Sequence, residues 1–129
     1  MGLTNLVLLP FQPFEQMRFV LATADVLIGI LESSAGIYSV PSKINSYLCA
    51  QRPLLMAVSS SNHAAKIIEE CRGGIVVSPE SISDFIYYAN KLYCDENLRI
   101  EYGKNARFYA ETHFNIDLIT DEFVRILNN

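Results

Sequence analysis

The fold is indicated first by the stretch Asp25-Val26-Leu27-Ile28-Gly29-Ile30-Leu31, an uninterrupted apolar run behind one aspartate. A segment of helical period follows over residues 42–50, and a second apolar run, Pro53-Leu54-Leu55-Met56-Ala57-Val58, comes soon after it. Such runs are typical of parallel strands that helices cover on both faces, and their alternation with helices is the βαβ pattern. The stretch therefore predicts an α/β fold with a parallel sheet.

The same alternation continues on both sides of this stretch. Four strands are predicted, at Leu6–Leu9, Asp25–Leu31, Pro53–Val58 and Gly74–Val77. Helices are predicted between them, at Phe14–Thr23, Ser42–Ala50 and Asn62–Arg72. Short loops join these elements, as is usual in α/β proteins.

After Pro79 the sequence carries helical periods alone. In the first helix Ile82, Phe85, Ile86, Ala89, Leu92 and Tyr93 fall on one face, and Ser81 with Asp84 resembles a capping box. A second helix is expected over Glu96–Thr112 with Leu98, Tyr102, Ala106 and Tyr109 inward, and a third from Ile116 with Ile119, Phe123, Ile126 and Leu127 inward. We therefore predict a single domain over residues 1–129, a Rossmann-like parallel sheet with flanking helices and a C-terminal helical tail.

Composition narrows the classes of function. The 129 residues carry a formal net charge of -4 and no basic run, which argues against nucleic-acid binding. The apolar runs are far shorter than the roughly 20 residues that span a bilayer, and the N-terminus has no secretory pattern, so we expect a cytoplasmic chain. Cys49, Cys71 and Cys94 lie at no metal-ligand spacing and are expected to be buried, reduced thiols.

The loop after the second predicted strand is the first candidate for a binding site. It spans Ser33 to Lys43, is rich in small residues, and leads through Pro41 into a helix. In open parallel sheets ligands bind beyond the carboxyl ends of the strands, where a helix start offers backbone N–H groups to an anion. A phosphate fits this description, although the loop matches neither a P-loop nor a GxGxxG fingerprint and an ordinary capped loop stays an alternative.

Several motifs in this region, taken together, resemble a known family. Val40-Pro41-Ser42-Lys43, Tyr47-Leu48-Cys49-Ala50 and Arg52-Pro53-Leu54-Leu55 resemble the "VPSK…YLAAGRPVL" signature of the GT-B glycosyltransferases of retaining family 4, especially members that build lipopolysaccharide O-antigen or capsule. Leu9-Pro10-Phe11-Gln12-Pro13-Phe14-Glu15-Gln16, Ala24-Asp25-Val26-Leu27, Asn62-His63-Ala64-Ala65 and Gly73-Gly74-Ile75-Val76-Val77 also look like landmarks of that family, in the same order. The resemblance covers nearly the whole chain.

The resemblance implies a two-domain enzyme that transfers a sugar, with retention, from a nucleoside diphosphate sugar to a polysaccharide or lipid-linked acceptor in cell-surface glycan synthesis. This chain is similar to the C-terminal, donor-binding domain alone, in truncated form, and is expected to be inactive without the N-terminal acceptor domain. No cofactor or metal is implied, and the full-length enzyme is expected in the cytoplasm or at the inner membrane.

Site residues follow from the resemblance position by position. The donor diphosphate is expected at Ser39, Val40, Pro41, Ser42 and Lys43, and the nucleobase near Phe11 and Gln12. The two acids of the family's Glu-x7-Glu motif, which face the donor sugar and ribose, align with Tyr38 and Ser46, and Glu32 is a further candidate for the sugar. Gln51 stands where the family has glycine, which implies strain if its φ is positive. No catalytic residue is assigned.

Two other functions stay open from the sequence. A non-catalytic scaffold or nucleotide-binding module of the same fold is favoured by the two absent acids. A receiver-like α/β protein is a weaker alternative, because the acidic cluster expected after its first strand is missing. Apolar surface left bare by the missing units further predicts self-association.

Overall fold

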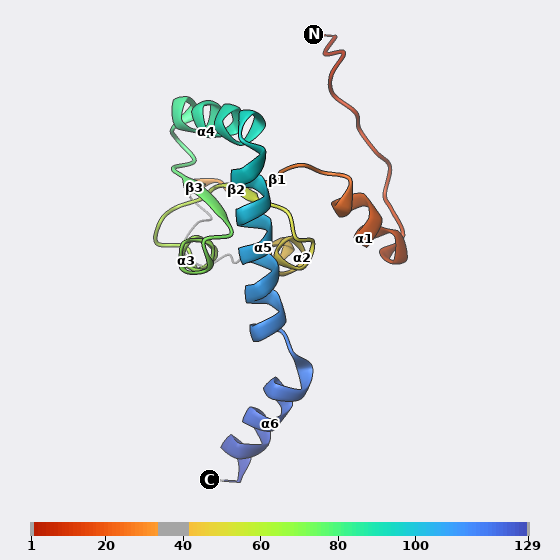
Figure 1. Cartoon of the computed structure of the whole chain (residues 1–129), viewed down its shortest axis with the longest axis vertical. Coiled ribbons are helices and arrows are strands. Elements are labelled where there is room, and N and C mark those ends of the chain that lie inside the picture. Colours follow the sequence, from red (N-terminus) through yellow and green to blue (C-terminus); the bar gives the residue numbers. More distant parts are fainter. Residues whose placement is uncertain (1, 34–41, 129) are drawn as a thin grey trace.

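The computed structural model describes residues 2–33 and 42–128, and in this part of the chain the fold is α/β (Figure 1). Six helices and three strands follow one another. They are α1 (Phe14–Ala22), β1 (Leu27–Ile30), α2 (Lys43–Cys49), β2 (Leu54–Ala57), α3 (His63–Cys71), β3 (Gly74–Val77), α4 (Ile82–Cys94), α5 (Glu96–His113) and α6 (Ile116–Leu127). The predicted helices and three of the four predicted strands are confirmed within a few residues.

The three strands form a small open parallel sheet in the order β1-β2-β3. Leu54 of β2 is in register with Leu27 of β1 and with Gly74 of β3. All four residues of β2 are buried, which explains its continuous apolar run, because helices cover this central strand on both faces.

Two apolar clusters lie on opposite faces of the sheet. On one face Leu54 and Met56 pack with Ile44 and Leu48 of α2, and with residues of α3 and the C-terminal half of α5. On the other face Leu55, Ala57 and Val77 pack with Leu92 of α4. The arrangement is that of a doubly covered α/β sheet.

Helix α5 closes the amino edge of this sheet. Its Gly103 lies against the backbone of Gln51, just before β2, and its Ala106 lies against Gly73, just before β3. Gln51 has a positive φ of 56°, the conformation that a glycine adopts without strain. Because α5 covers the amino ends of the strands, their carboxyl ends are the ones left open. This carboxyl edge is where α/β proteins bind ligands.

Side chains of α5 also hold the ends of three other helices. Arg107 donates to the carbonyl of Cys49 at the end of α2 (2.9 Å), and Asn105 donates to the carbonyl of Arg72 after α3 (3.1 Å). Arg99 donates to the carbonyls of Leu92 and Tyr93 at the end of α4. These bonds satisfy carbonyl groups that a helix leaves unpaired at its C-terminus.

The prediction of a strand at Leu6–Leu9 is wrong. Residues 6–13 have no secondary structure, and the side chains of Leu6 to Leu9 are exposed. No strand among the described residues pairs with this segment, and a strand without a neighbour leaves its backbone groups without a ladder.

The predictions about buried faces are corrected for two of the three C-terminal helices. In α6 the four expected inward residues are exposed, because the helix runs away from the sheet and finds no surface to cover (Figure 1). In α4 Leu92 is buried but Ile82, Ile86 and Tyr93 are exposed, since the small sheet covers a narrow stripe of the helix. In α5 Leu98, Tyr102, Ala106 and Tyr109 face the core as expected.

The cysteines are free, as predicted, but none of the three is fully buried. Cys49 and Cys94 each lie in the last turn of a helix and are exposed, while Cys71 is half-buried. Among the described residues, no helix is both long and apolar enough to cross a membrane.

Candidate functional site

A crevice of about 270 Å³ opens at the carboxyl edge of the sheet. All three strands lead into it: Ser33 follows β1, Val58 to Ser60 follow β2, and Ser78 to Glu80 follow β3. Val76, Val77 and Glu69 complete the wall among the described residues. The polar side chains of the crevice are therefore gathered by the parallel topology, since the carboxyl ends of parallel strands meet at one edge.

Hydrogen bonds fix several of these polar groups. The Ser33 hydroxyl donates to Oε1 of Glu80 at 2.7 Å, which joins the end of β1 to the end of β3 across the loop of β2. The hydroxyls of Ser59 and Ser61 lie 2.8 Å apart. The backbone N–H of Glu80 donates to the Ser78 hydroxyl at 3.4 Å.

The start of α3 lies directly after Ser59–Ser61, the three serines that follow β2. Asn62, which is fully buried, caps the helix with its side-chain oxygen, which accepts from the N–H of Ala64 at 2.8 Å. The cap stabilises the first turn of α3 beside the crevice, because it satisfies one of the N–H groups that a helix start leaves without a partner in the helix.

The charge of the crevice indicates what it can bind. Glu69 and Glu80 supply two carboxylates and the serines supply hydroxyls, and within the described part of the wall there is no lysine, arginine or histidine. Carboxylates accept hydrogen bonds, and serine hydroxyls both donate and accept. The wall suits a neutral, hydroxyl-rich group such as a sugar or a ribose better than it suits a phosphate.

The predicted diphosphate loop falls mostly outside the described residues. Tyr38, Ser39, Val40 and Pro41 are not among them. Ser42 and Lys43 are exposed at the start of α2, and Lys43 lies in its first turn, as predicted. Glu32 is exposed beside Ser33 on the segment that enters the crevice.

The other predicted site residues lie away from this crevice. Ser46 is exposed on α2 and lines a separate groove of about 440 Å³ between α1 and α2, together with Phe14, Met17 and Leu21. Phe11 is 98% exposed, and Gln12 donates to the carbonyl of Pro10 (2.8 Å) in the N-terminal segment. The structure therefore does not bring the ribose and nucleobase candidates together with Ser33 and Glu80.

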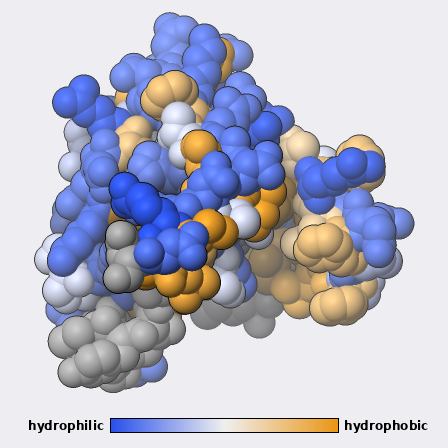
Figure 2. Space-filling model, turned by 90° about the horizontal axis from the view of Figure 1, so that it is seen from below, coloured by the Kyte–Doolittle hydropathy of each residue, from blue (hydrophilic) through white to orange (hydrophobic). Residues whose placement is uncertain are grey.

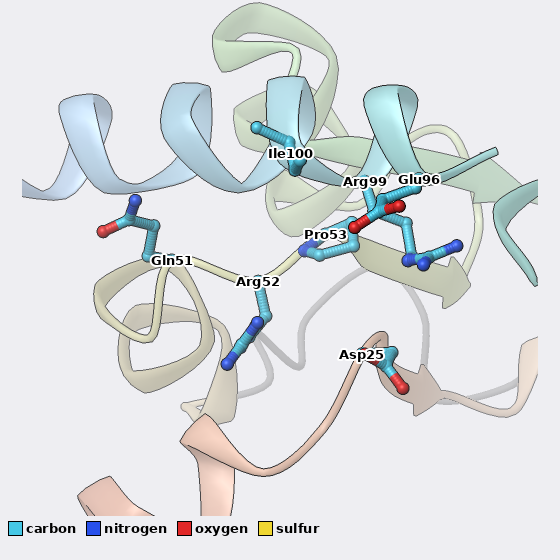
Figure 3. Close-up of a pocket in the computed structure, with 7 residues that line it drawn as sticks. All are labelled: Asp25, Gln51, Arg52, Pro53, Glu96, Arg99 and Ile100. Carbon is cyan, nitrogen blue, oxygen red and sulfur yellow. The ribbon is translucent and has the colours of Figure 1, made fainter.

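A cavity of about 190 Å³ at the opposite, amino edge contains the charged residues Asp25, Arg52, Glu96 and Arg99 (Figure 3). Both arginines are engaged in structure: Arg52 donates to the carbonyl of Ala22 at the end of α1, and Arg99 holds the end of α4. The two arginines of this cavity therefore have a structural role, because they cap the ends of α1 and α4. In the described part of the chain no group of three or more His, Cys, Asp or Glu side chains could hold a metal ion.

The chain matches no family model, no curated protein and no solved structure.

Sequence reasoning missed the crevice residues Ser59, Ser78 and Glu80. Each is a polar residue shortly after an apolar strand, and no spacing links one to another. A usable signal exists in hindsight: polar residues that follow successive parallel strands converge at one edge of the sheet.

Proposed function

We propose that this chain is the donor-binding domain of a retaining GT-B glycosyltransferase, which transfers a sugar from a nucleoside diphosphate sugar to a polysaccharide or lipid-linked acceptor in cell-surface glycan synthesis. The observation that carries the proposal is the hydroxyl- and carboxylate-lined crevice at the carboxyl edge of a parallel sheet. The family motifs of the sequence support it, and the enzyme would act on the cytoplasmic side.

The crevice would recognise the hydroxyl groups of the donor. Oε1 of Glu80 already accepts from Ser33, and its carboxylate has further lone pairs for ribose or sugar hydroxyls. In this proposal Glu80 supplies the carboxylate that binds the ligand. Position 46, where the family has an acid, holds a serine and cannot do so. A hydrogen bond to a charged group contributes about 1.5–3 kcal/mol, so one carboxylate has a measurable effect on affinity.

The diphosphate would lie toward residues 39–43, as the sequence motif implies. Lys43 at the start of α2 is exposed and supplies a positive charge there. When the bond between the sugar and the diphosphate breaks, negative charge grows on the leaving diphosphate. A fixed cation and backbone N–H groups stabilise that charge in the transition state.

The chemistry itself would need the acceptor domain of the full-length enzyme. Positioning of two reactants supplies roughly 7–11 kcal/mol of a barrier, and in GT-B enzymes this positioning takes place between two domains. We therefore propose that the isolated chain binds donor but does not turn it over.

A specific observation favours a second function, a non-catalytic module of the same fold. Tyr38 and Ser46 stand where the family's two acids would be, so ribose and sugar contacts are weakened. Such a module would serve as a scaffold or bind nucleotide without catalysis.

Calorimetric titration of the chain with nucleoside diphosphates and their sugars tests the proposal. Binding at millimolar or tighter affinity is expected, and Glu80→Gln should weaken it at least tenfold, which corresponds to about 1.4 kcal/mol. Glu101→Gln, an exposed acid on α5, is the matched control and should leave affinity unchanged. If no nucleotide gives a detectable heat of binding, the result would favour the second function, a non-catalytic scaffold.

A further inference from the structure

Strand β1 forms one side of the sheet, with β2 as its neighbour among the described residues. The N–H groups of Leu27 and Leu31 donate to the carbonyls of Pro53 and Ala57, both at 2.9 Å. Alternate residues of a parallel ladder point to opposite sides, so the backbone groups of Ile28 and Ile30 point away from β2. The carbonyl of Ile28 accepts a long bond, 3.5 Å, from the hydroxyl of Tyr47.

The side chains of this edge are uncovered as well. Ile28 is 47% exposed and Ile30 is 71% exposed, whereas their partners in register, Leu55 and Ala57, are buried beneath α4. An apolar edge strand of this kind is a template on which another strand pairs.

The same chain carries an apolar segment suited to that edge. Leu6, Val7, Leu8 and Leu9 are all exposed, Leu8 at 83%, and they belong to a segment without secondary structure. Figure 1 shows this segment running clear of the sheet beyond α1, and Figure 2 shows apolar side chains on this part of the molecule, at the right of the view.

We propose that two copies of the chain exchange these segments: Leu6–Leu9 of one copy pairs as a strand with the outer edge of β1 in the other, and the exchange is reciprocal. A second copy is the partner because each chain holds both an uncovered apolar edge strand and an exposed apolar segment that lies away from its own sheet. Such an exchange closes as a two-fold dimer and leaves no repeating edge. Pairing provides both the backbone ladder and a cover for Ile28 and Ile30.

Light scattering after size-exclusion chromatography tests the interface in the whole chain. A dimer is expected, and Ile30→Lys should weaken it at least tenfold, since it places a charge on the exposed edge. The matched control is Leu127→Lys on α6, where the leucine is 81% exposed. A monomeric parent chain, or a dimer lost in the control and kept in Ile30→Lys, would overturn the proposal.

A second test concerns the segment itself. Val7→Pro and Leu8→Pro each remove one N–H, and because alternate residues of a strand point to opposite sides, one of the two lies in the ladder with β1. At least one of these variants should dissociate the dimer, whereas Leu3→Pro, outside the segment, should not. Equal dimerisation of all three variants would contradict strand pairing.

Crosslinking then identifies the partner. In a chain whose native cysteines are replaced by alanine, a Leu8→Cys copy mixed with an Ile28→Cys copy should be joined by a short bis-maleimide, in higher yield than with a Leu127→Cys copy. If a single chain carrying both new cysteines is joined mainly within itself, the segment occupies its own β1 and the exchange is refuted.

Discussion

Replacement of Gly103 by alanine tests how α5 closes the amino edge of the sheet. Gly103 is buried, and a Cβ atom added there would lie 2.6 Å from the carbonyl oxygen of Gln51 and 3.1 Å from its carbonyl carbon. The obstacle is backbone in a turn with positive φ, so it cannot rotate away as a flexible side chain would. We expect Gly103→Ala to destabilise the fold.

Two opposed effects set the size of the change in the free energy of unfolding caused by Gly103→Ala. Alanine in the middle of a helix is favoured over glycine by about 1 kcal/mol. Overpacking of a closely packed site costs about 1–3 kcal/mol, and a backbone obstacle places this site toward the upper end. The expected net loss is therefore about 1–2 kcal/mol in the free energy of unfolding, opposite in sign to an ordinary glycine-to-alanine change in a helix.

Urea unfolding followed by circular dichroism measures this loss. With a slope of about 2 kcal/mol per molar urea, in the middle of the usual range, the midpoint should fall by about 0.5–1 M. Lys104→Ala, the exposed neighbour, is the control and should stay within about 0.5 kcal/mol of the parent. A midpoint raised by Gly103→Ala would refute the close approach of α5 to Gln51.

The double variant Gly103→Ala with Gln51→Gly isolates the cause. A glycine at position 51 relieves the positive φ and lets the turn shift, so the cost of Gly103→Ala should fall by at least about 0.5 kcal/mol in that background. Equal costs in both backgrounds would show that the turn at Gln51 is not the obstacle.

Three further predictions concern stability and reactivity. Arg107→Ala, which removes the bond to the end of α2, should cost about 1 kcal/mol in urea unfolding, whereas Glu111→Ala, which removes the exposed ion pair alone, should cost under about 0.5 kcal/mol. Asn62→Ala should cost about 1–2 kcal/mol and lower Tm in a thermal melt, because the buried cap of α3 is lost. Burial raises the pKa of the Cys71 thiol, so at pH 8 it should react with iodoacetamide more slowly than Cys94, and stability should fall as pH rises past the unfolded thiol pKa; equal labelling rates would contradict this.

Sequence patterns were sufficient for the elements that pack against one another. The runs at β1, β2 and β3 are near-continuously apolar because helices lie on both faces of the sheet, and the helical periods between them correspond to α2 and α3. A strained turn at Gln51 was also anticipated, from the expectation of glycine at that position.

The failures have a common physical cause. Leu6–Leu9 and α6 have the pattern of a strand and of an amphipathic helix, but a pattern specifies only what a segment can bury. Whether a surface is present to bury it depends on the tertiary arrangement, and among the described residues none covers these two segments. The exposed residues Leu6 to Leu9, together with the uncovered edge of β1, are the features on which the exchange of strands is proposed.

The candidate site was located only in part. The carboxyl edge after β1 was predicted from general rules for α/β sheets, and Glu32 and Lys43 lie on the segments that border it. The bond between Ser33 and Glu80 was not foreseeable, because it joins residues 47 positions apart that meet through the order of strands, and strand order cannot be read from spacing.

Binding of a nucleoside diphosphate sugar in the crevice at the carboxyl edge is tested by heteronuclear NMR of the labelled chain during titration with donor sugars. We expect saturable shifts of the amides of Ser33, Ser59 to Ser61, Ser78 and Glu80, together with Lys43. Glu80→Gln should reduce these shifts at equal donor concentration, while Glu101→Gln should not. Shifts confined to the amino edge around Arg52 and Arg99, or no saturable shift with any donor, would contradict it.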